Sequence, residues 1–406
     1  MSIRVAVVMH GHQGDRCRLA AYRDILGAVC DKRAPYSVDL TGTTIENLRR
    51  HYPETIQQVR NVFSREAGSL DPYKPEILAT PDQHMNLVPL ELELDNWGVF
   101  MAMARRQVRR NIDQIHSVFG IHPRGVFPAE NVLAPAAAAI LQKEGMAYVV
   151  IDGVHLERLG IANSQIYAVE GTRFVSTNRY FGMCDGYCHE RSPWEVVQRI
   201  KQYAHRSGIY QFVLACDLDL YEKIGWDVAM EVTWLMGFAD ALFQEPGIEM
   251  VNVASIADWG NQGHPIFDLR KTYAECGVKD PHHFTSSWIG SHLNEWLSYP
   301  PTREANSHIN DFIRYDGWLR WRLGNVSGQL NQWRQGRGEL FAWCDRLFGE
   351  IERTEENWFG IAGMEFRHPG WVKGFSERFY SAHALRLGEL RSIDNELSRL
   401  EHFAFH

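Results

Sequence analysis

From the N-terminus to about Asp258, apolar residues occur in two alternating patterns. Short apolar runs, often β-branched, alternate with longer segments in which apolar residues recur every three or four positions. The short runs are typical of buried strands, and the longer segments are typical of amphipathic helices. Strand and helix therefore alternate, and this order favours an α/β fold with a mostly parallel sheet, open or closed into a barrel.

The pattern predicts a strand at each of residues 3–10, 36–42, 76–80, 125–127, 147–153, 210–220 and 248–259. It predicts helices at residues 19–31, 46–66 with a break at Pro53, 96–120, 131–145, 194–208 and 227–244. From residue 327 onward the chain is almost wholly helical in pattern. We therefore expect a catalytic sheet domain over residues 1–265 and a helical domain over residues 266–406. Between residues 163 and 193 the pattern weakens, which indicates a long loop over the site.

One isolated carboxylate lies at the centre of this pattern. The segment 119–152 reads as strand, helix and strand, and Glu130 follows the first of these strands. In parallel sheets and barrels, the carboxyl ends of the strands carry the ligand site, so Glu130 is a candidate catalytic residue. The alternative is that Glu130 stabilises the start of the following helix, where acidic residues are common.

Further polar residues follow other strands. Asp217 and Asp219 end the predicted strand 210–220, as Glu130 ends its own. His10 and His12 end the first strand and point to the same side, since side chains alternate along a strand. Two carboxylates at one sheet edge suit cleavage of a glycosidic bond. Two imidazoles and a carboxylate could equally form an open Zn²⁺ site, while a lone buried histidine is usually a core residue.

Composition narrows the classes of partner. The formal net charge of −8 argues against nucleic acid. No apolar run approaches the roughly 18 residues that suggest a membrane span, and the N-terminal run is too short for a signal peptide. The seven scattered cysteines do not suggest a disulfide framework, which favours the cytoplasm. The thirteen tryptophans suit either a core or sugar stacking.

Five segments together resemble the motifs of glycoside hydrolase family 57, in the family's order and spacing. They are HGHQ at 10–13, EILATPDQH at 76–84, GVFPAE at 125–130, CDLDLYEKIG at 216–225 and EENWFG at 355–360. In this resemblance Glu130 is the nucleophile and Asp217 the acid/base. The remaining matched residues imply substrate binding: His10, His12, Gln13, His84, Asp219, Glu355, Trp358 and, in a tryptophan-containing stretch, Trp288.

The resemblance implies a (β/α)7 barrel with a C-terminal α-helical domain that completes the cleft. It also implies retaining chemistry on α-linked oligo- or polysaccharides, without a metal or another cofactor. Hydrolysis, transglycosylation and branching are all compatible with these motifs. Two alternatives stay open: a metal-dependent carbohydrate deacetylase that uses the strand-end histidines, and a carbohydrate-binding relative without turnover.

Overall fold

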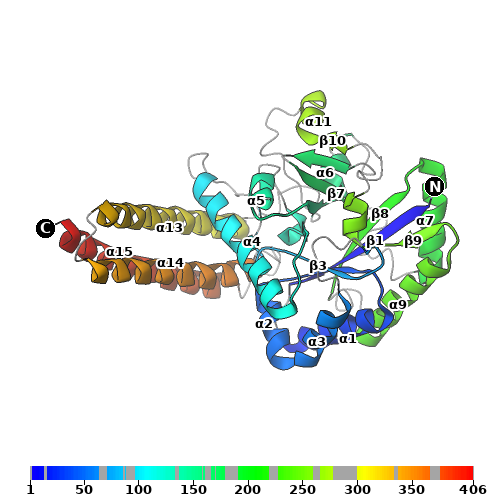
Figure 1. Ribbon diagram of the computed structural model, residues 1–406, viewed down its shortest axis with the longest axis horizontal. Coiled ribbons are helices and arrows are strands. Elements are labelled where there is room, and N and C mark those ends of the chain that lie inside the picture. The colour runs from blue at the N-terminus through cyan, green and yellow to red at the C-terminus, as the bar shows by residue number, and fades with distance from the viewer. Residues whose placement is uncertain are drawn as a thin grey trace. The chain divides into compact units, whose positions relative to one another are not determined.

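The chain alternates strands and helices and then continues in long helices (Figure 1). The computed structural model describes residues 2–12, 16–63, 71–85, 87, 97–132, 137–157, 159–160, 166–169, 171–178, 191–218, 227–258, 266–277, 300–332, 337–365 and 375–405. Its strands are β1 (Ile3–Gly11), β2 (Ser37–Leu40), β3 (Glu76–Leu78), β4 (Gly125–Val126), β5 (Tyr148–Ile151), β6 (Ile166–Val169), β7 (Thr172–Ser176), β8 (Gln211–Asp217), β9 (Ile248–Met250) and β10 (Ile266–Asp268).

The helices in the first part of the chain are α1 (Arg16–Lys32), α2 (Gly42–His51), α3 (Pro53–Val62), α4 (Trp97–Phe119), α5 (Ala138–Lys143), α6 (Gly153–Glu157), α7 (Pro193–Ser207), α9 (Val228–Gln244), α10 (Val253–Ala257) and α11 (Leu269–Glu275). Three long helices follow: α13 (Pro300–Gln332), α14 (Gly338–Glu365) and α15 (Phe375–Phe405). The α/β class expected from the sequence is confirmed. None of the described helices is long and apolar enough to cross a membrane.

The strands form two five-stranded sheets. The first has the order β3-β2-β1-β8, with β9 also paired to β1, and all of its described pairs are parallel. The second has the order β10-β6-β7-β5-β4, and there the β6–β7 pair is antiparallel. The central strand β1 is buried along almost its whole length, as expected for a strand of a parallel sheet covered on both faces.

The closed (β/α)7 barrel that we expected is not confirmed, because the described strands form two sheets and no closed barrel. The two sheets are linked on one side by Ala79, which bridges to Val126. On the other side, the backbone N–H of Asn178 donates to the carbonyl of Val213 at 2.7 Å. These links between the described residues do not make a continuous ladder, since a ladder requires repeated pairs of backbone hydrogen bonds.

Both sheets contribute side chains to one apolar core. Its members lie on the inner faces of the strands and on α10, and they include Ala6, Val8, Leu78, Phe127, Tyr148, Val150, Val175, Val213, Ala215 and Ile256. Along β1 and β8 the core residues are alternate positions, as the two-residue period of a strand requires. At the carboxyl ends of β1 and β8, the next residues that point inward therefore lie at the edge of the same core.

Helix α7 shows how local sequence sets an element's limits. Ser192 caps its N-terminus in a capping box with Glu195, and Pro193 occupies the first turn, where its missing N–H costs no hydrogen bond. Gly208 ends the helix at a φ of 72°, a left-handed conformation that glycine adopts without steric cost. The predicted helix 194–208 is thus confirmed to within one residue at either end.

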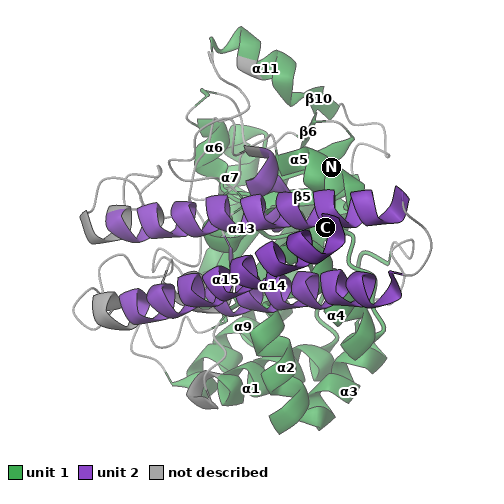
Figure 2. Cartoon of the chain, turned by 90° about the vertical axis from the view of Figure 1, so that its left-hand side faces the viewer, with its two compact units in different colours: residues 1–82, 86–88, 104–292 green, residues 83–85, 89–103, 293–406 purple. Residues whose placement is uncertain are grey.

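Figure 2 colours the chain by its two compact units. Unit 1 comprises residues 1–82, 86–88 and 104–292, and unit 2 comprises residues 83–85, 89–103 and 293–406. In unit 2 the long helices α13, α14 and α15 pack against one another, with Trp358 of α14 in contact with Phe312 and Phe379 of the other two. The domain boundary expected near residue 265 falls in residues 259–265, outside the described residues.

The segment 163–193, in which we expected a long loop, contains regular structure. Strands β6 and β7 pair within it as an antiparallel hairpin, and Gly171 adopts a φ of 87° in the turn between them. Residues 179–190 of this segment lie outside the described residues.

Candidate functional site

Three polar side chains lie in one row across adjacent strands of the first sheet. His10 of β1 is paired in register with Asp39 of β2 on one side and with Asp217 of β8 on the other. All three residues are buried. The row lies at the carboxyl ends of these parallel strands, which is where α/β sheets place their ligand sites.

His10 and Asp39 form a tight buried pair. The Nδ1 of His10 lies 2.6 Å from Oδ2 of Asp39, and neither side chain is exposed. Burial by itself would lower the pKa of His10, but the charge and the hydrogen bond of Asp39 raise it, and so do the charges of Asp217 and Glu130. The net effect is a raised pKa for His10, which favours the imidazolium form. Asp217, the partner of His10 in the β1–β8 register, is thus one of the carboxylates that favour the charged ring.

Glu130 lies just after β4, in a turn of 3-10 helix at Ala129–Asn131. Glu130 and Asn131 both have positive φ values, 52° and 51°, and both are buried. A left-handed conformation costs a non-glycine residue roughly 1–2 kcal/mol, so two in succession are unfavourable unless the surroundings fix them. Such strain concentrates at functional sites.

The helix-capping alternative for Glu130 is not supported. We expected a helix over residues 131–145, but the described helix, α5, is preceded by Ala137 as its N-cap. Glu130 is thus seven residues before the cap and does not stabilise the start of α5. Its burial and strained backbone agree better with a role in the site.

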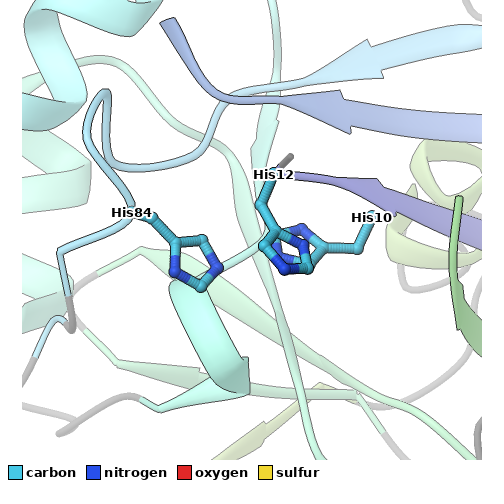
Figure 3. Close-up of side chains that lie close together, drawn as sticks. All are labelled: His10, His12 and His84. Atoms are coloured by element: carbon cyan, nitrogen blue, oxygen red, sulfur yellow. The ribbon is translucent and has the colours of Figure 1, made fainter. Parts of the chain in front are cut away.

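Three histidines form a compact group, drawn in Figure 3. The ring nitrogens that His10, His12 and His84 could offer to an ion all lie within 4.8 Å of one another. The rings of His10 and His12 are stacked with their centroids 4.7 Å apart. His84 has a φ of 60°, again a left-handed conformation. These imidazoles could hold a divalent metal such as Zn²⁺, or donate to the hydroxyl groups of a sugar.

The other predicted site residues divide into two groups. Gln13, Asp219 and Trp288 lie outside the described residues. Glu355 and Trp358 lie on α14, and the contacts described for them are within unit 2.

Glu355 and Trp358 occupy the interior of the helical unit. Glu355 accepts a 2.8 Å hydrogen bond from Arg320 and is not exposed. The Trp358 ring is also unexposed and packs against Phe312, Phe379 and His383. With both faces covered in this way, Trp358 has no free surface on which a sugar ring could stack in the described conformation.

Two buried acids of the sheet were not singled out from the sequence. Asp39 is the lone charge in the short strand SVDL, and Glu76 begins β3. A carboxylate inside an otherwise apolar strand could have identified them, because a buried acid is rarely found without a partner. Glu76 accepts hydrogen bonds from Ser37, Tyr148 and the backbone N–H of Ala254. These bonds join β3 to β2, β5 and α10, which is a structural role.

Comparison with known proteins identifies the family. The sequence profile described as glycosyl hydrolase family 57 matches residues 13–254, more than half of the chain and including His84, Glu130 and Asp217. The chain belongs to glycosyl hydrolase family 57, which confirms the resemblance noted in the motifs. Among curated proteins, none matches the sequence.

Three solved structures show the same fold at low sequence identity. The GH57-type branching enzyme from Pyrococcus horikoshii has a TM-score of 0.62 at 14% identity, over 100% of this chain and 92% of its own. The α-amylase AmyC from Thermotoga maritima has a TM-score of 0.57 at 10% identity, over 100% and 96%. The 4-α-glucanotransferase from Thermococcus litoralis has a TM-score of 0.52 at 14% identity, over 90% of this chain but only 60% of its own.

Proposed function

We propose that the chain is a retaining glycosidase or transglycosidase that acts on α-linked glucan or a related α-glycoside. The observation that supports this proposal is the register of Asp217 with His10 across β8 and β1, beside which Glu130 is a second buried carboxylate. Both carboxylates are buried near strand ends, and both act on the charge of the same imidazole. Two acids of this kind at one site are the chemical requirement of glycoside cleavage.

In the proposed double displacement, Glu130 attacks the anomeric carbon while Asp217 gives its proton to the departing glycosidic oxygen. The bond from carbon to the leaving oxygen breaks as the bond to Glu130 forms. Asp217 then takes a proton from water or from an acceptor hydroxyl, which displaces Glu130 and restores both groups. The choice between water and a sugar acceptor decides between hydrolysis and transfer.

The proposed substrate rests on the family and on the structural relatives. The relatives of known structure are named as a branching enzyme, an α-amylase and a 4-α-glucanotransferase. We extend that substrate class to this chain as part of the proposal. The predicted sugar contacts of His10, His12, Gln13, His84, Asp219 and Trp288 belong to the proposal as well. The burial of Glu355 and Trp358 inside unit 2 favours a structural role for these two residues.

The test is product analysis by mass spectrometry after incubation of the protein with α-linked gluco-oligosaccharides and α-glucans. Glu130→Gln removes the nucleophile and is expected to lower turnover by roughly 10³-fold or more. Glu144→Gln is the matched control, because Glu144 is a buried acid of the same segment whose partners are Arg105 and Arg109. Turnover in Glu130→Gln as high as in the control would contradict the assignment.

The group of three histidines favours a second candidate function, a metal-dependent carbohydrate deacetylase. Its ring nitrogens lie within 4.8 Å of one another, which is compact enough to bind one ion after small side-chain shifts. The test is the metal content of the purified protein, together with acetate release from acetylated oligosaccharides before and after chelation. Acetate release that depends on the metal would replace the glycosidase proposal, and glucan cleavage that survives chelation would exclude this candidate.

A further inference from the structure

Asp39 is a buried acid in the proposed site. Its one described side-chain partner is His10. Neither it nor His10 is exposed, and their 2.6 Å contact joins Oδ2 to Nδ1. A histidine nitrogen at this distance from a carboxylate donates its proton to the carboxylate oxygen. The ring of His10 is therefore held in the form that carries a proton on Nδ1.

The register of the sheet explains how Asp39 reaches this position. His10 is paired with Asp39 across β1 and β2, and with Asp217 across β1 and β8. Paired residues of neighbouring strands point to the same face of a sheet. His10 continues the inward series of Ala6 and Val8, so the whole row faces the core side.

A purely structural role explains Asp39 poorly. A buried ion pair is often no more stabilising than apolar residues of similar volume, because both charges lose their hydration. Glu76, on the neighbouring strand β3, shows what a structural acid in this sheet looks like, since it binds two hydroxyl groups and a backbone N–H. The one described side-chain partner of Asp39 is instead His10, which is paired in register with the proposed acid/base Asp217.

We propose that Asp39 is a positioning residue, which fixes the ring of His10 so that Nε2 is directed to the space shared by Asp217 and Glu130. This inference rests on the proposed function. With Nδ1 held by Asp39, Nε2 is the nitrogen that would donate to a sugar oxygen next to the anomeric carbon. A donor fixed there forms a hydrogen bond that strengthens as charge develops during the attack of Glu130.

The experiment compares Asp39→Asn with Glu76→Gln in the full-length protein. Asp39→Asn keeps the size of the side chain, but its amide can turn its NH₂ toward His10 and favour the wrong tautomer. We expect kcat on the glucan substrate to fall roughly 100-fold, as for a misplaced catalytic group. We expect KM to change by less than about threefold, because the lost interaction is one realised in the transition state. Glu76→Gln should lower Tm and leave kcat within about twofold of the parent.

A spectroscopic measurement keeps the inference independent of turnover. The Nδ1 proton of a histidine bound to a carboxylate gives a strongly downfield proton NMR signal that exchanges slowly. We expect this signal in the parent and in Glu76→Gln, and we expect it to be lost in both His10→Asn and Asp39→Asn.

The outcomes separate this inference from the proposed function. Should no glucan be turned over by the parent, the proposed function fails, yet loss of the signal in Asp39→Asn would still support the positioning of His10. A signal that survives in Asp39→Asn overturns the inference. So does a kcat in Asp39→Asn equal to that of the parent, or a loss of kcat that Glu76→Gln reproduces.

Discussion

Asp217 lies directly opposite His10 in the β1–β8 ladder, so one strand pair brings together two side chains that are about 200 residues apart in the chain. Both are buried at the carboxyl end of the sheet. This pairing depends on hydrogen bonds between backbones, and so it is fixed more firmly than a contact between surface loops would be.

The first prediction concerns the role of Asp217. Asp217→Asn should lower turnover of natural glucans by roughly 10²- to 10⁴-fold, the usual contribution of a general acid. It should lower the first step far less for aryl glycosides, whose leaving groups depart without a proton. Comparison of kcat/KM for the two substrate types measures this difference. An equal loss on both would argue that Asp217 binds substrate and transfers no proton.

The second prediction concerns the strained turn at Glu130 and Asn131. Because Asn131 has a φ of 51°, Asn131→Ala should be less stable than Asn131→Gly by about 1 kcal/mol. Both variants remove the same amide, whose atoms have no hydrogen-bond partner among the described residues, so their difference isolates the backbone conformation. Chemical denaturation of the two proteins gives the comparison. Equal stabilities would show that the left-handed conformation is not held in solution.

The third prediction concerns the interior of the helical unit. Glu355→Ala should destabilise unit 2 by about 2–3 kcal/mol, because it leaves Arg320 with Asp316 as its remaining buried partner. Glu356→Ala, at the exposed neighbouring position, should change stability by less than about 0.5 kcal/mol. Thermal unfolding followed by circular dichroism measures both. If Glu355→Ala weakened substrate binding and left stability unchanged, the role implied by the sequence motif would be favoured over the structural one.

A fourth prediction concerns pH. Burial lowers the pKa of His383 to about 4, and the neighbouring His308 acts in the same direction. Above the ordinary histidine pKa of about 6.5 the ring is neutral in both folded and unfolded chains, and its contribution to stability is complete. As pH falls from about 6.5 to about 4, the unfolded chain binds the proton first, and folding is progressively weakened.

The difference between the parent and His383→Gln isolates this effect from other titrating groups. Over that pH range the parent should lose about 2 kcal/mol more than the variant, after allowance for partial hydration of the ring. Denaturation curves at pH 7 and pH 4.5 provide the measurement. Parallel loss in both proteins would mean that His383 is not held neutral in the folded chain.

The sequence predicted the order of elements and the strand-end carboxylates well, because both depend on local periodicity. It did not predict Asp39 as a partner of His10, since their contact depends on the register between β1 and β2. Nor did it predict whether the strands close, because closure depends on hydrogen bonds between strands far apart in the chain. Trp358 was assigned to sugar stacking from its motif, and helical spacing alone could not show that its ring packs in a bundle.

The pairing of β1 also has a consequence for biosynthesis. This strand leaves the ribosome well before its partners β8 and β9, which are made about 200 residues later. At synthesis rates of roughly 5–20 residues per second, the apolar strand waits some 10–40 s before its pairing can be completed. Nascent chains of this protein should therefore need protection from aggregation until β8 and β9 have emerged, and His10 cannot meet Asp217 before β8 has been made.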